Sequence, residues 1–323
     1  MKMRLLSKIK DFLHIQRGIV ESTKIIVESC SNDVVDRLYY KCKVDELNNS
    51  VINSHQRGIT DTRIAETEVI VSLTTHSFRI YDVYLAIESI MQGTMLPNRI
   101  ILWLSEEYKN TPLPITLQNQ IKRGLEVRYC KDIRSYTKLL PALKEFPQSA
   151  IVTIDDDIIY PIETLEYLVN AYHSSGDCIC AHWVHYIPAD LHSKYISILN
   201  WPMVREPIAE SPFLFYEGFG GVLYPPNSLD KEVFNEEVFL DICKYADDVW
   251  FNAMSMRKGT KVRYANPRPS LFKYLINPNV QSIALKNVNS NDKILNDVQI
   301  HDVFEKYGVF ERIADWYHNN SSC

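Results

Sequence analysis

Three consecutive aspartates, Asp155, Asp156 and Asp157, stand between two apolar runs in the segment SAIVTIDDDIIYP, residues 149–161. The run before this triad has the residue types of a buried strand. Like charges at the end of a buried strand repel one another and lose hydration, and both effects cost free energy. A divalent cation offsets that cost, and Mg²⁺ or Mn²⁺ typically binds one or two protein carboxylates together with water and substrate phosphates. The triad therefore predicts a cation site, because the alternative, a solvated turn that caps a helix, explains one aspartate better than three.

A second acidic group, the pair Asp247 and Asp248, opens a helical pattern after a loop in the segment YADDVWFNAM. Two adjacent carboxylates can raise the pKa of one of them, which suits a general base. The alternative is an ordinary pair at a helix N-terminus, where backbone amides and the helix dipole stabilise aspartate. The pair by itself leaves both interpretations open.

Strand and helix patterns alternate around these acidic groups. Apolar runs predict buried strands at residues 68–75, 98–105, 125–130, 150–155 and 177–184. Helical patterns lie between them, and two of these end at Gly93 and Gly124. A strand about every 25–30 residues with a helix between predicts βαβ units and a mostly parallel sheet with helices on both faces. In such an α/β sheet ligands bind outside the carboxyl ends of the strands, where the triad lies.

The remaining segments surround this α/β core. Residues 1–65 are helical and polar in pattern and end in a connector, so we expect an N-terminal helical extension followed by one domain over residues 66–323. The segment after Pro188 is rich in Pro, Gly and aromatic residues, which predicts loops that shape a substrate site. Beyond Asn266 the pattern indicates Asn-rich loop and one further helix, at residues 297–308.

The bulk composition argues against some classes of protein. The chain has 323 residues, 46% of them apolar, without a run of about 18 apolar residues that could span a membrane. Its net charge of −5 argues against nucleic-acid phosphate as the partner. The seven cysteines are scattered and we recognise no export signal, so we expect reduced thiols and a cytoplasmic protein.

The first twenty residues combine basic side chains with apolar ones at helical spacing. Lys2, Arg4, Lys8 and Lys10 stand beside the apolar positions, a pattern typical of an amphipathic helix that binds anionic lipid at a membrane surface. The pattern predicts a peripheral contact with the inner face of a membrane. A helix that packs on its own domain, or on a second subunit, is the alternative.

The polar segments occur in the order found in GT-A fold glycosyltransferases. VTIDDDIIYP resembles the D-x-D element of these enzymes, and VIVSLTTHSFRI resembles their first strand and nucleotide-binding loop. KDIRSYTKLLPAL is similar to the segment that brings an Asp and a Lys to the nucleotide. YEGFGGVLYPP and ADDVWF resemble the glycine-rich acceptor wall and the acidic pair that supplies a catalytic carboxylate. The resemblance runs from Val69 to Tyr264 and rests on the ordered set of motifs.

This resemblance implies a Rossmann-like GT-A fold and a UDP-sugar donor. It implies that Asp157 binds Mn²⁺ or Mg²⁺, and that Asp155 reaches the ribose or shares the ion. For Lys138 it implies a contact with phosphate, although a solvated helix lysine is the alternative. The predicted donor-binding residues are Thr74, Thr75, Arg79, Asp132, Lys138, Asp155 and Asp156.

The resemblance also favours Asp248, with Asp247 beside it, as the base that takes the acceptor proton in an inverting transfer. Family members often complete the metal shell with a C-terminal histidine, for which His301 and His318 are available, and His301 is the candidate ligand after Asp157 and Asp155. A histidine on a helix surface is the plainer interpretation of His301.

One further cluster, in CICAHWVH, has side chains that zinc accepts. Strand alternation places Cys178, Cys180 and His182 on one face, as in any half-buried strand. Their spacing lacks the usual zinc-ligand pattern, so we expect no structural zinc there.

The predicted function is metal-dependent, inverting transfer of a hexose-type sugar from a UDP-sugar to a glycan or lipid-linked acceptor in bacterial surface polysaccharide synthesis. A nucleotidyltransferase is the alternative among enzymes, but the glycine-rich basic loop expected after its first strand is missing from SLTTHSFRI. A catalytically inactive carbohydrate-binding or scaffold protein is the third hypothesis, against which the intact acidic residues argue.

Overall fold

The structure is a computed structural model that describes residues 34–188, 197–266, 273–283 and 295–320. The chain forms two compact units, residues 1–49 and residues 50–323. The described part of the first unit is helical and belongs to a helix that covers residues 34–53. The amphipathic helix expected in the first twenty residues lies outside the described residues. The domain boundary expected at residue 65 stays a prediction.

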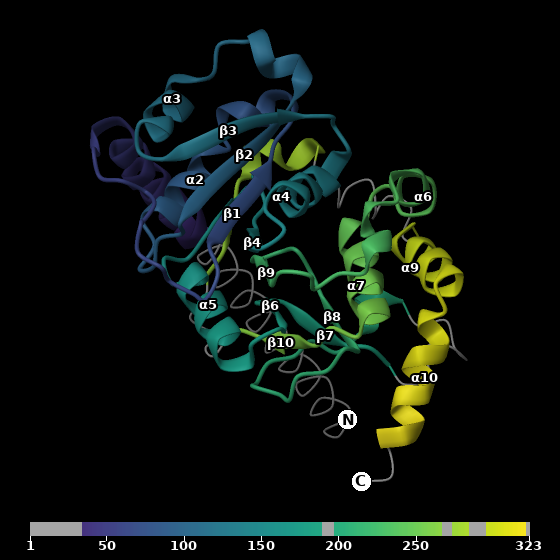
Figure 1. Cartoon of the computed structure of the whole chain (residues 1–323). Helices are drawn as coiled ribbons and strands as arrows, with labels where there is room; N and C mark the ends of the chain where they lie inside the picture. Colours follow the sequence, from purple (N-terminus) through teal and green to yellow (C-terminus); the bar gives the residue numbers. More distant parts are fainter. Residues whose placement is uncertain (1–33, 189–196, 267–272, 284–294, 321–323) are drawn as a thin grey trace, which may run out of the picture. The chain divides into compact units, whose positions relative to one another are not determined.

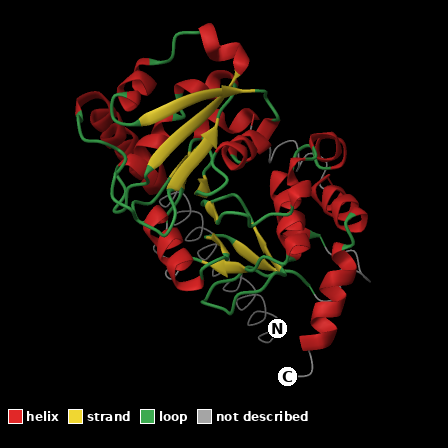
Figure 2. Cartoon of the chain, viewed as in Figure 1, coloured by secondary structure: helices red, strands yellow, loops and turns green. Residues whose placement is uncertain are grey.

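Within the described residues of the second unit, seven strands form the central sheet, which Figure 2 shows in yellow. Their order is β10–β6–β9–β4–β1–β2–β3. The strands are β1 (Val69–Thr74), β2 (Arg99–Ser105), β3 (Leu125–Cys130), β4 (Ala150–Thr153), β6 (Ile179–Ala181), β9 (Val222–Tyr224) and β10 (Val262–Tyr264). Strand β9 runs antiparallel to both of its neighbours, and the other paired strands are parallel. The predicted α/β fold with a mostly parallel sheet is confirmed.

Helices lie on both faces of this sheet (Figure 1). Side chains along each strand alternate between two hydrophobic cores, one on each face. Val69 and Val71 of β1 belong to one core and Ile70 to the other. The first core takes side chains from α2 (Tyr84–Met91), α3 (Ile115–Ile121) and α5 (Thr164–Ser175). The second takes them from α4 (Leu140–Glu145), α6 (Glu236–Ile242), α7 (Asp247–Lys258), α9 (Leu295–Lys306) and α10 (Val309–Asn320).

Some elements differ from the sequence prediction. The strand expected at residues 177–184 is divided between β6 and β7 (Val184–Tyr186), which pairs with β8 (Leu214–Tyr216) outside the central sheet. Among the described residues after Asn266 there are two α-helices, α9 and α10, where one was expected. Gly308 lies between them with φ of 60°, a left-handed conformation that ends the first helix at little cost for glycine.

The carboxyl ends of four parallel strands meet at one edge of the sheet. The register pairs Ser72 of β1 with Thr153 of β4, and Ser105 of β2 with Cys130 of β3. The chain segments that follow β1, β2, β3 and β4 therefore lie next to one another, although 20 or more residues separate them along the sequence. Two short 3₁₀ helices, η1 (Ser77–Tyr81) and η3 (Arg134–Lys138), stand at this edge.

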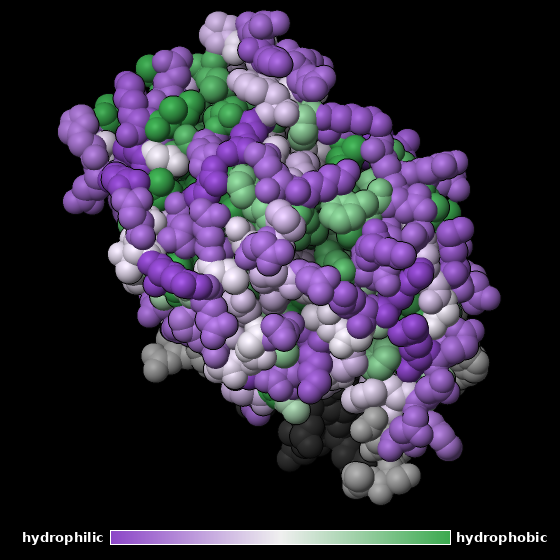
Figure 3. Space-filling view, viewed as in Figure 1, coloured by the Kyte–Doolittle hydropathy of each residue, from purple (hydrophilic) through white to green (hydrophobic). Residues whose placement is uncertain are grey.

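No helix among the described residues is long and apolar enough to cross a membrane. The face of the molecule in Figure 3 carries mostly hydrophilic side chains, with smaller hydrophobic areas between them.

Candidate functional site

A cavity of about 1040 Å³ opens at the carboxyl edge of the sheet. Ten of the eleven side chains predicted from the sequence line it, and they come from the last residue of β1, from the segments after β1, β3 and β4, and from the start of α7. These are Thr74, Thr75, Arg79, Asp132, Lys138, Asp155, Asp156, Asp157, Asp247 and Asp248. Residues far apart in the sequence thus line one cavity, as expected for the carboxyl ends of parallel strands.

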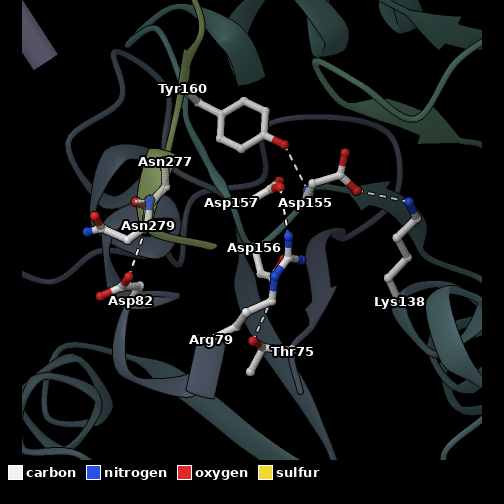
Figure 4. A network of polar contacts seen from close by, with 10 residues as sticks. All are labelled: Thr75, Arg79, Asp82, Lys138, Asp155, Asp156, Asp157, Tyr160, Asn277 and Asn279. Atoms are coloured by element: carbon white, nitrogen blue, oxygen red, sulfur yellow. Dashed lines mark hydrogen bonds and ion pairs between the residues drawn. The ribbon is translucent and has the colours of Figure 1, made fainter. Parts of the chain in front are cut away.

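The middle aspartate of the triad points toward the loop that follows β1 (Figure 4). Asp156 is buried and accepts hydrogen bonds from Thr75 Oγ1 at 2.6 Å and from Arg79 Nη1 at 2.5 Å. Burial raises the pKa of Asp156 to about 6, and the Arg79 and Thr75 contacts limit that rise. Asp156 therefore orients Arg79 at the wall of the cavity.

The two outer aspartates are the more accessible members of the triad. Arg79 Nη2 lies 2.9 Å from Asp157 Oδ2, and Lys138 Nζ lies 3.0 Å from Asp155 Oδ1. The side chain of Asp155 is 28% exposed and that of Asp157 is 17% exposed. The hydroxyl oxygen of buried Tyr160 accepts from the backbone N–H of Asp155 at 2.7 Å and holds this turn in place. Asp155 and Asp157, two residues apart, face the cavity.

Lys138 joins the triad to the acidic pair. Its Nζ lies 3.0 Å from Asp155 Oδ1 and 3.1 Å from Asp247 Oδ2. Burial disfavours the charge on Lys138, but Asp155 and Asp247 outweigh that effect and raise its pKa. Lys138 is therefore a buried, charged bridge rather than a solvated helix lysine.

The acidic pair begins α7, directly after Ala246, which has no side-chain hydrogen bond to cap the helix. Oδ1 of Asp248 is buried and has no hydrogen-bond partner among the described residues. Burial and the Asp247 charge raise the pKa of Asp248 to about 8, and Lys138 and the Gly218 backbone limit that rise. A Cβ on Gly218 would lie 2.8 Å from Asp248 Oδ1 and 3.1 Å from Lys138 Nζ, so a larger residue would displace the Asp248 carboxylate from its present position. An orphaned carboxylate oxygen with a raised pKa is suited to accept a proton.

The side chains of two predicted donor-binding residues, Thr74 and Asp132, form hydrogen bonds with backbone groups. Thr74 Oγ1 donates to the carbonyl oxygen of Trp103 at 2.9 Å. Asp132 Oδ1 accepts from the backbone N–H of Arg134 at 2.7 Å. Arg134 has φ of 63°, which a non-glycine residue adopts at a cost, so Asp132 stabilises a strained turn at the cavity.

His301 lies apart from the other ten residues. It is on α9, its side chain is 58% exposed, and its contacts are with Asp302 and with the ring of Phe310. It does not line the cavity. His301 is thus a side chain on the surface of α9, away from Asp155 and Asp157. This position gives no support to the prediction that it completes a metal shell with them.

The cysteine and histidine cluster near β6 is buried in the fold. Cys180 Sγ donates to the carbonyl oxygen of Cys178 at 3.5 Å, and His182 Nε2 lies 3.0 Å from the carbonyl oxygen of Thr164. Burial lowers the pKa of His182 to about 4. The contacts of Cys178, Cys180 and His182 are therefore those of buried core side chains.

Sequence reasoning missed a second polar pair in the same cavity, His185 and Glu217. His185 Nε2 lies 2.8 Å from Glu217 Oε1, and Nδ1 lies 3.2 Å from the carbonyl oxygen of Trp201. Burial disfavours the charged imidazole, but Glu217 outweighs that effect and raises the pKa of His185. Nothing in the local sequence signals this contact, because 32 residues separate the two side chains.

The side chains around the triad fit a divalent cation that has few protein ligands. Within the described residues, no three His, Cys, Asp or Glu side chains are placed to hold an ion by themselves. Mg²⁺ and Mn²⁺ sites with one or two carboxylates do not require three, because substrate phosphates complete the shell. The triad and the acidic pair bring five carboxyl groups, and four of them, those of Asp155, Asp156, Asp157 and Asp247, contact the two cations Arg79 and Lys138. This excess of negative charge favours a further cation at Asp155 and Asp157.

No protein-family model and no curated protein matches the chain. The solved structures that match the chain include the following two. The first, described as mannosyltransferase PcManGT from Pyrobaculum calidifontis in complex with GDP-Man and Mn²⁺, has a TM-score of 0.41 and 14% identity over 72% of this chain and 63% of that chain. The second, described as S. aureus TarS 1-349, has a TM-score of 0.38 and 9% identity over 65% of this chain and 60% of that chain. The chain thus spans less than two thirds of either protein, and similarity at this level carries no argument about activity.

Proposed function

We propose that the chain is a metal-dependent, inverting glycosyltransferase. In this proposal it transfers a hexose-type sugar from a UDP-sugar to a glycan or lipid-linked acceptor in the synthesis of a bacterial surface polysaccharide. One observation supports the proposal most: the residues predicted for the donor and the residue predicted for the base line the same cavity. A donor and an acceptor can react only if both binding sites open into one space.

The donor half of the site is the triad with Arg79 and Lys138. Asp155 and Asp157 would hold Mn²⁺ or Mg²⁺, which would offset the charge that develops on the leaving diphosphate. Without a cation, the five carboxyl groups of the triad and acidic pair would repel a diphosphate. Arg79 and Lys138 add positive charge on two sides of the triad, as Figure 4 shows.

The acceptor half of the site is the start of α7 with Gly218. The unpartnered Oδ1 of Asp248 accepts the proton of the acceptor hydroxyl, and Asp247 keeps that carboxylate basic by repulsion. Direct attack by one hydroxyl, with Asp248 as the general base, inverts the configuration at the sugar carbon.

The test is a screen of UDP- and GDP-sugars for thermal stabilisation and hydrolysis with and without Mn²⁺. A ligand that binds the folded state raises Tm by mass action, so UDP with Mn²⁺ should stabilise the protein more than either alone. Asp157→Asn should abolish that synergy and leave the fold intact. Asp61→Asn is the matched control, because Asp61 is an exposed aspartate paired with Arg57 and does not line the cavity. Equal stabilisation by UDP in the presence of a chelator would contradict the cation site.

The released product distinguishes this function from the alternatives. A glycosyltransferase releases the nucleoside diphosphate, whereas a nucleotidyltransferase acting on a nucleoside triphosphate and a sugar phosphate releases pyrophosphate. A carbohydrate-binding or scaffold protein binds glycans without turnover. Assays for UDP, for pyrophosphate and for glycan binding therefore separate the three hypotheses.

A further inference from the structure

A short segment near the C-terminal end of the described chain returns to the triad. We call residues 273–280 the strap. Its strand β11 (Leu275–Ile276) pairs antiparallel with β5 (Ile158–Ile159), which directly follows the triad. Ile276 lines the cavity, so the strap forms part of the cavity wall.

Asn277 is the residue through which the strap holds the triad. Its backbone N–H donates to the carbonyl oxygen of Asp157 at 2.7 Å, and its Nδ2 donates to Asp82 Oδ2 at 3.0 Å. Its Oδ1 accepts from the backbone N–H of Asn279 at 3.0 Å. Asn277 is 2% exposed, and in Figure 4 the triad lies between it and Lys138.

Asp82 connects this contact to Arg79. Asp82 follows η1, and its backbone N–H donates to the carbonyl oxygen of Arg79 at 2.9 Å. Arg79 donates from Nη2 to Asp157 Oδ2 at 2.9 Å. Asn277, Asp82, Arg79 and Asp157 therefore form a closed ring of contacts, in which Asn277 binds the chain on both sides of the Arg79–Asp157 ion pair.

We propose that Asn277 is a positioning residue for the donor site. It holds Arg79 and Asp157 at the separation that the donor and its cation require, because neither residue can move away without breaking a bond to the ring. This role rests on the function proposed above. If Asn277 had a purely structural role, it would only stabilise the start of η6 (Pro278–Ile283) through its hydrogen bond to Asn279. Its replacement would then leave the donor affinity unchanged.

The experiment exchanges the donor and the acceptor of one hydrogen bond. Asn277→Asp places a carboxylate against Asp82 and removes the donated bond, so we expect the Kd of UDP with Mn²⁺ to rise about tenfold or more. The double variant Asp82→Asn with Asn277→Asp restores one amide and one carboxylate with their places exchanged, and we expect it to recover most of the lost affinity. Calorimetric titration measures each Kd at a temperature where circular dichroism shows every variant to be folded.

A control and a second measurement separate positioning from stability. Asn235→Ala removes the side-chain cap of α6, whose Oδ1 accepts from the Val238 amide, so it destabilises the fold away from the ring. It should leave the Kd unchanged. Without any nucleotide, backbone amides of residues 155–159 should exchange hydrogen faster in Asn277→Asp and return toward wild-type rates in the double variant.

The outcomes decide the role and the proposed function separately. If wild-type protein binds UDP with Mn²⁺ and Asn277→Asp binds it equally well, Asn277 has no positioning role and the proposed function stands. A folded double variant that recovers no affinity would show that the Asp82 bond is not the cause. If wild-type protein binds no nucleoside diphosphate with Mn²⁺, the proposed function falls, and the positioning role falls with it.

Discussion

Asp155, Asp156 and Asp157 are adjacent in the sequence but occupy three different environments. Asp156 is buried against Thr75 and Arg79, whereas the outer two side chains reach the cavity. Arg79 and Lys138 offset part of the repulsion within the triad, at distances of 2.5–3.0 Å. The remaining negative charge is directed toward the cavity, where a cation and a diphosphate would meet.

Replacement of Asp248 separates chemistry from binding. A general base acts in the transition state, so Asp248→Asn should lower kcat by about 10²–10⁴-fold and leave the Kd of the donor nearly unchanged. Steady-state kinetics with a saturating acceptor, together with donor titration, measures both quantities. Near-normal turnover by this variant would mean that the acidic pair only begins a helix.

The pH profile tests how Asp247 acts on Asp248. The base works only when ionised, and its pKa is raised, so kcat/KM should increase with pH up to values above the usual carboxyl range. Burial is the first cause of the raised pKa and repulsion by Asp247 is the second. Asp247→Asn removes the second cause and should shift the rising limb to lower pH. A limb that stays in place would show that Asp247 does not tune the base.

At the scale of elements, the sheet edge and the N-terminus of α7 bring the two halves of the site together. Lys138 of η3 contacts Asp155 after β4 and Asp247 at the start of α7. Gly218 lies against the same lysine and against Asp248, where the Cβ of a larger residue would come within 2.8 Å of Asp248 Oδ1. The buried ammonium group of Lys138 thus lies among three separate segments, which contribute Asp155, Asp247 and Gly218.

A buried ion pair fastens the helices on one face of the sheet. Arg123, just after α3, donates to both carboxylate oxygens of Glu88 on α2, at 2.8 and 2.9 Å. Ser50 and Gln120 donate to the same carboxylate. The side chain of Glu88 is 0% exposed and that of Arg123 is 4% exposed, so the pair is fully desolvated.

Removal of one partner from this ion pair should lower the stability of the fold. Arg123→Met leaves the Glu88 carboxylate buried without its cation, so we expect the free energy of unfolding to fall by about 3–5 kcal/mol. Urea denaturation at neutral pH measures the loss. Arg57→Met is the matched control, because Arg57 and Asp61 form an exposed pair, and it should leave the stability nearly unchanged. Similar losses of unfolding free energy in the two variants would show that the Glu88–Arg123 pair contributes no more to stability than the exposed pair.

At the scale of the whole molecule, the membrane contact predicted for the first twenty residues is a proposal independent of the cavity. If residues 1–20 form an amphipathic helix on the membrane surface, their deletion should leave activity on a short acceptor nearly unchanged. The same deletion should weaken binding to anionic vesicles, and added salt should weaken vesicle binding by the intact chain. Vesicle sedimentation at two salt concentrations measures this. Loss of folding on deletion would show instead that the segment packs on the domain or on a second subunit.

The sequence by itself determined the α/β class and most members of the candidate site. Alternation of apolar residues is a local property, so the runs that became β1 to β4 could be recognised without the fold. Parallel strands place their carboxyl ends at the edge of the sheet where ligands bind, so the triad after the fourth run was expected there, whereas Thr75 and Asp132 were expected there only through the resemblance to GT-A fold glycosyltransferases.

Only the tertiary structure decided what each side chain contacts. Thr75 and Asp156 are 81 residues apart in the sequence, and Asn277 and Asp82 are 195 residues apart. At such sequence separations, the periodicity of apolar residues does not predict which side chains contact each other. The antiparallel insertion of β9 between β4 and β6 brings Gly218 to Asp248, and the packing of α9 leaves His301 at the surface. These contacts depend on the packing of the whole chain, because a buried polar group is stable only where distant residues supply its partners.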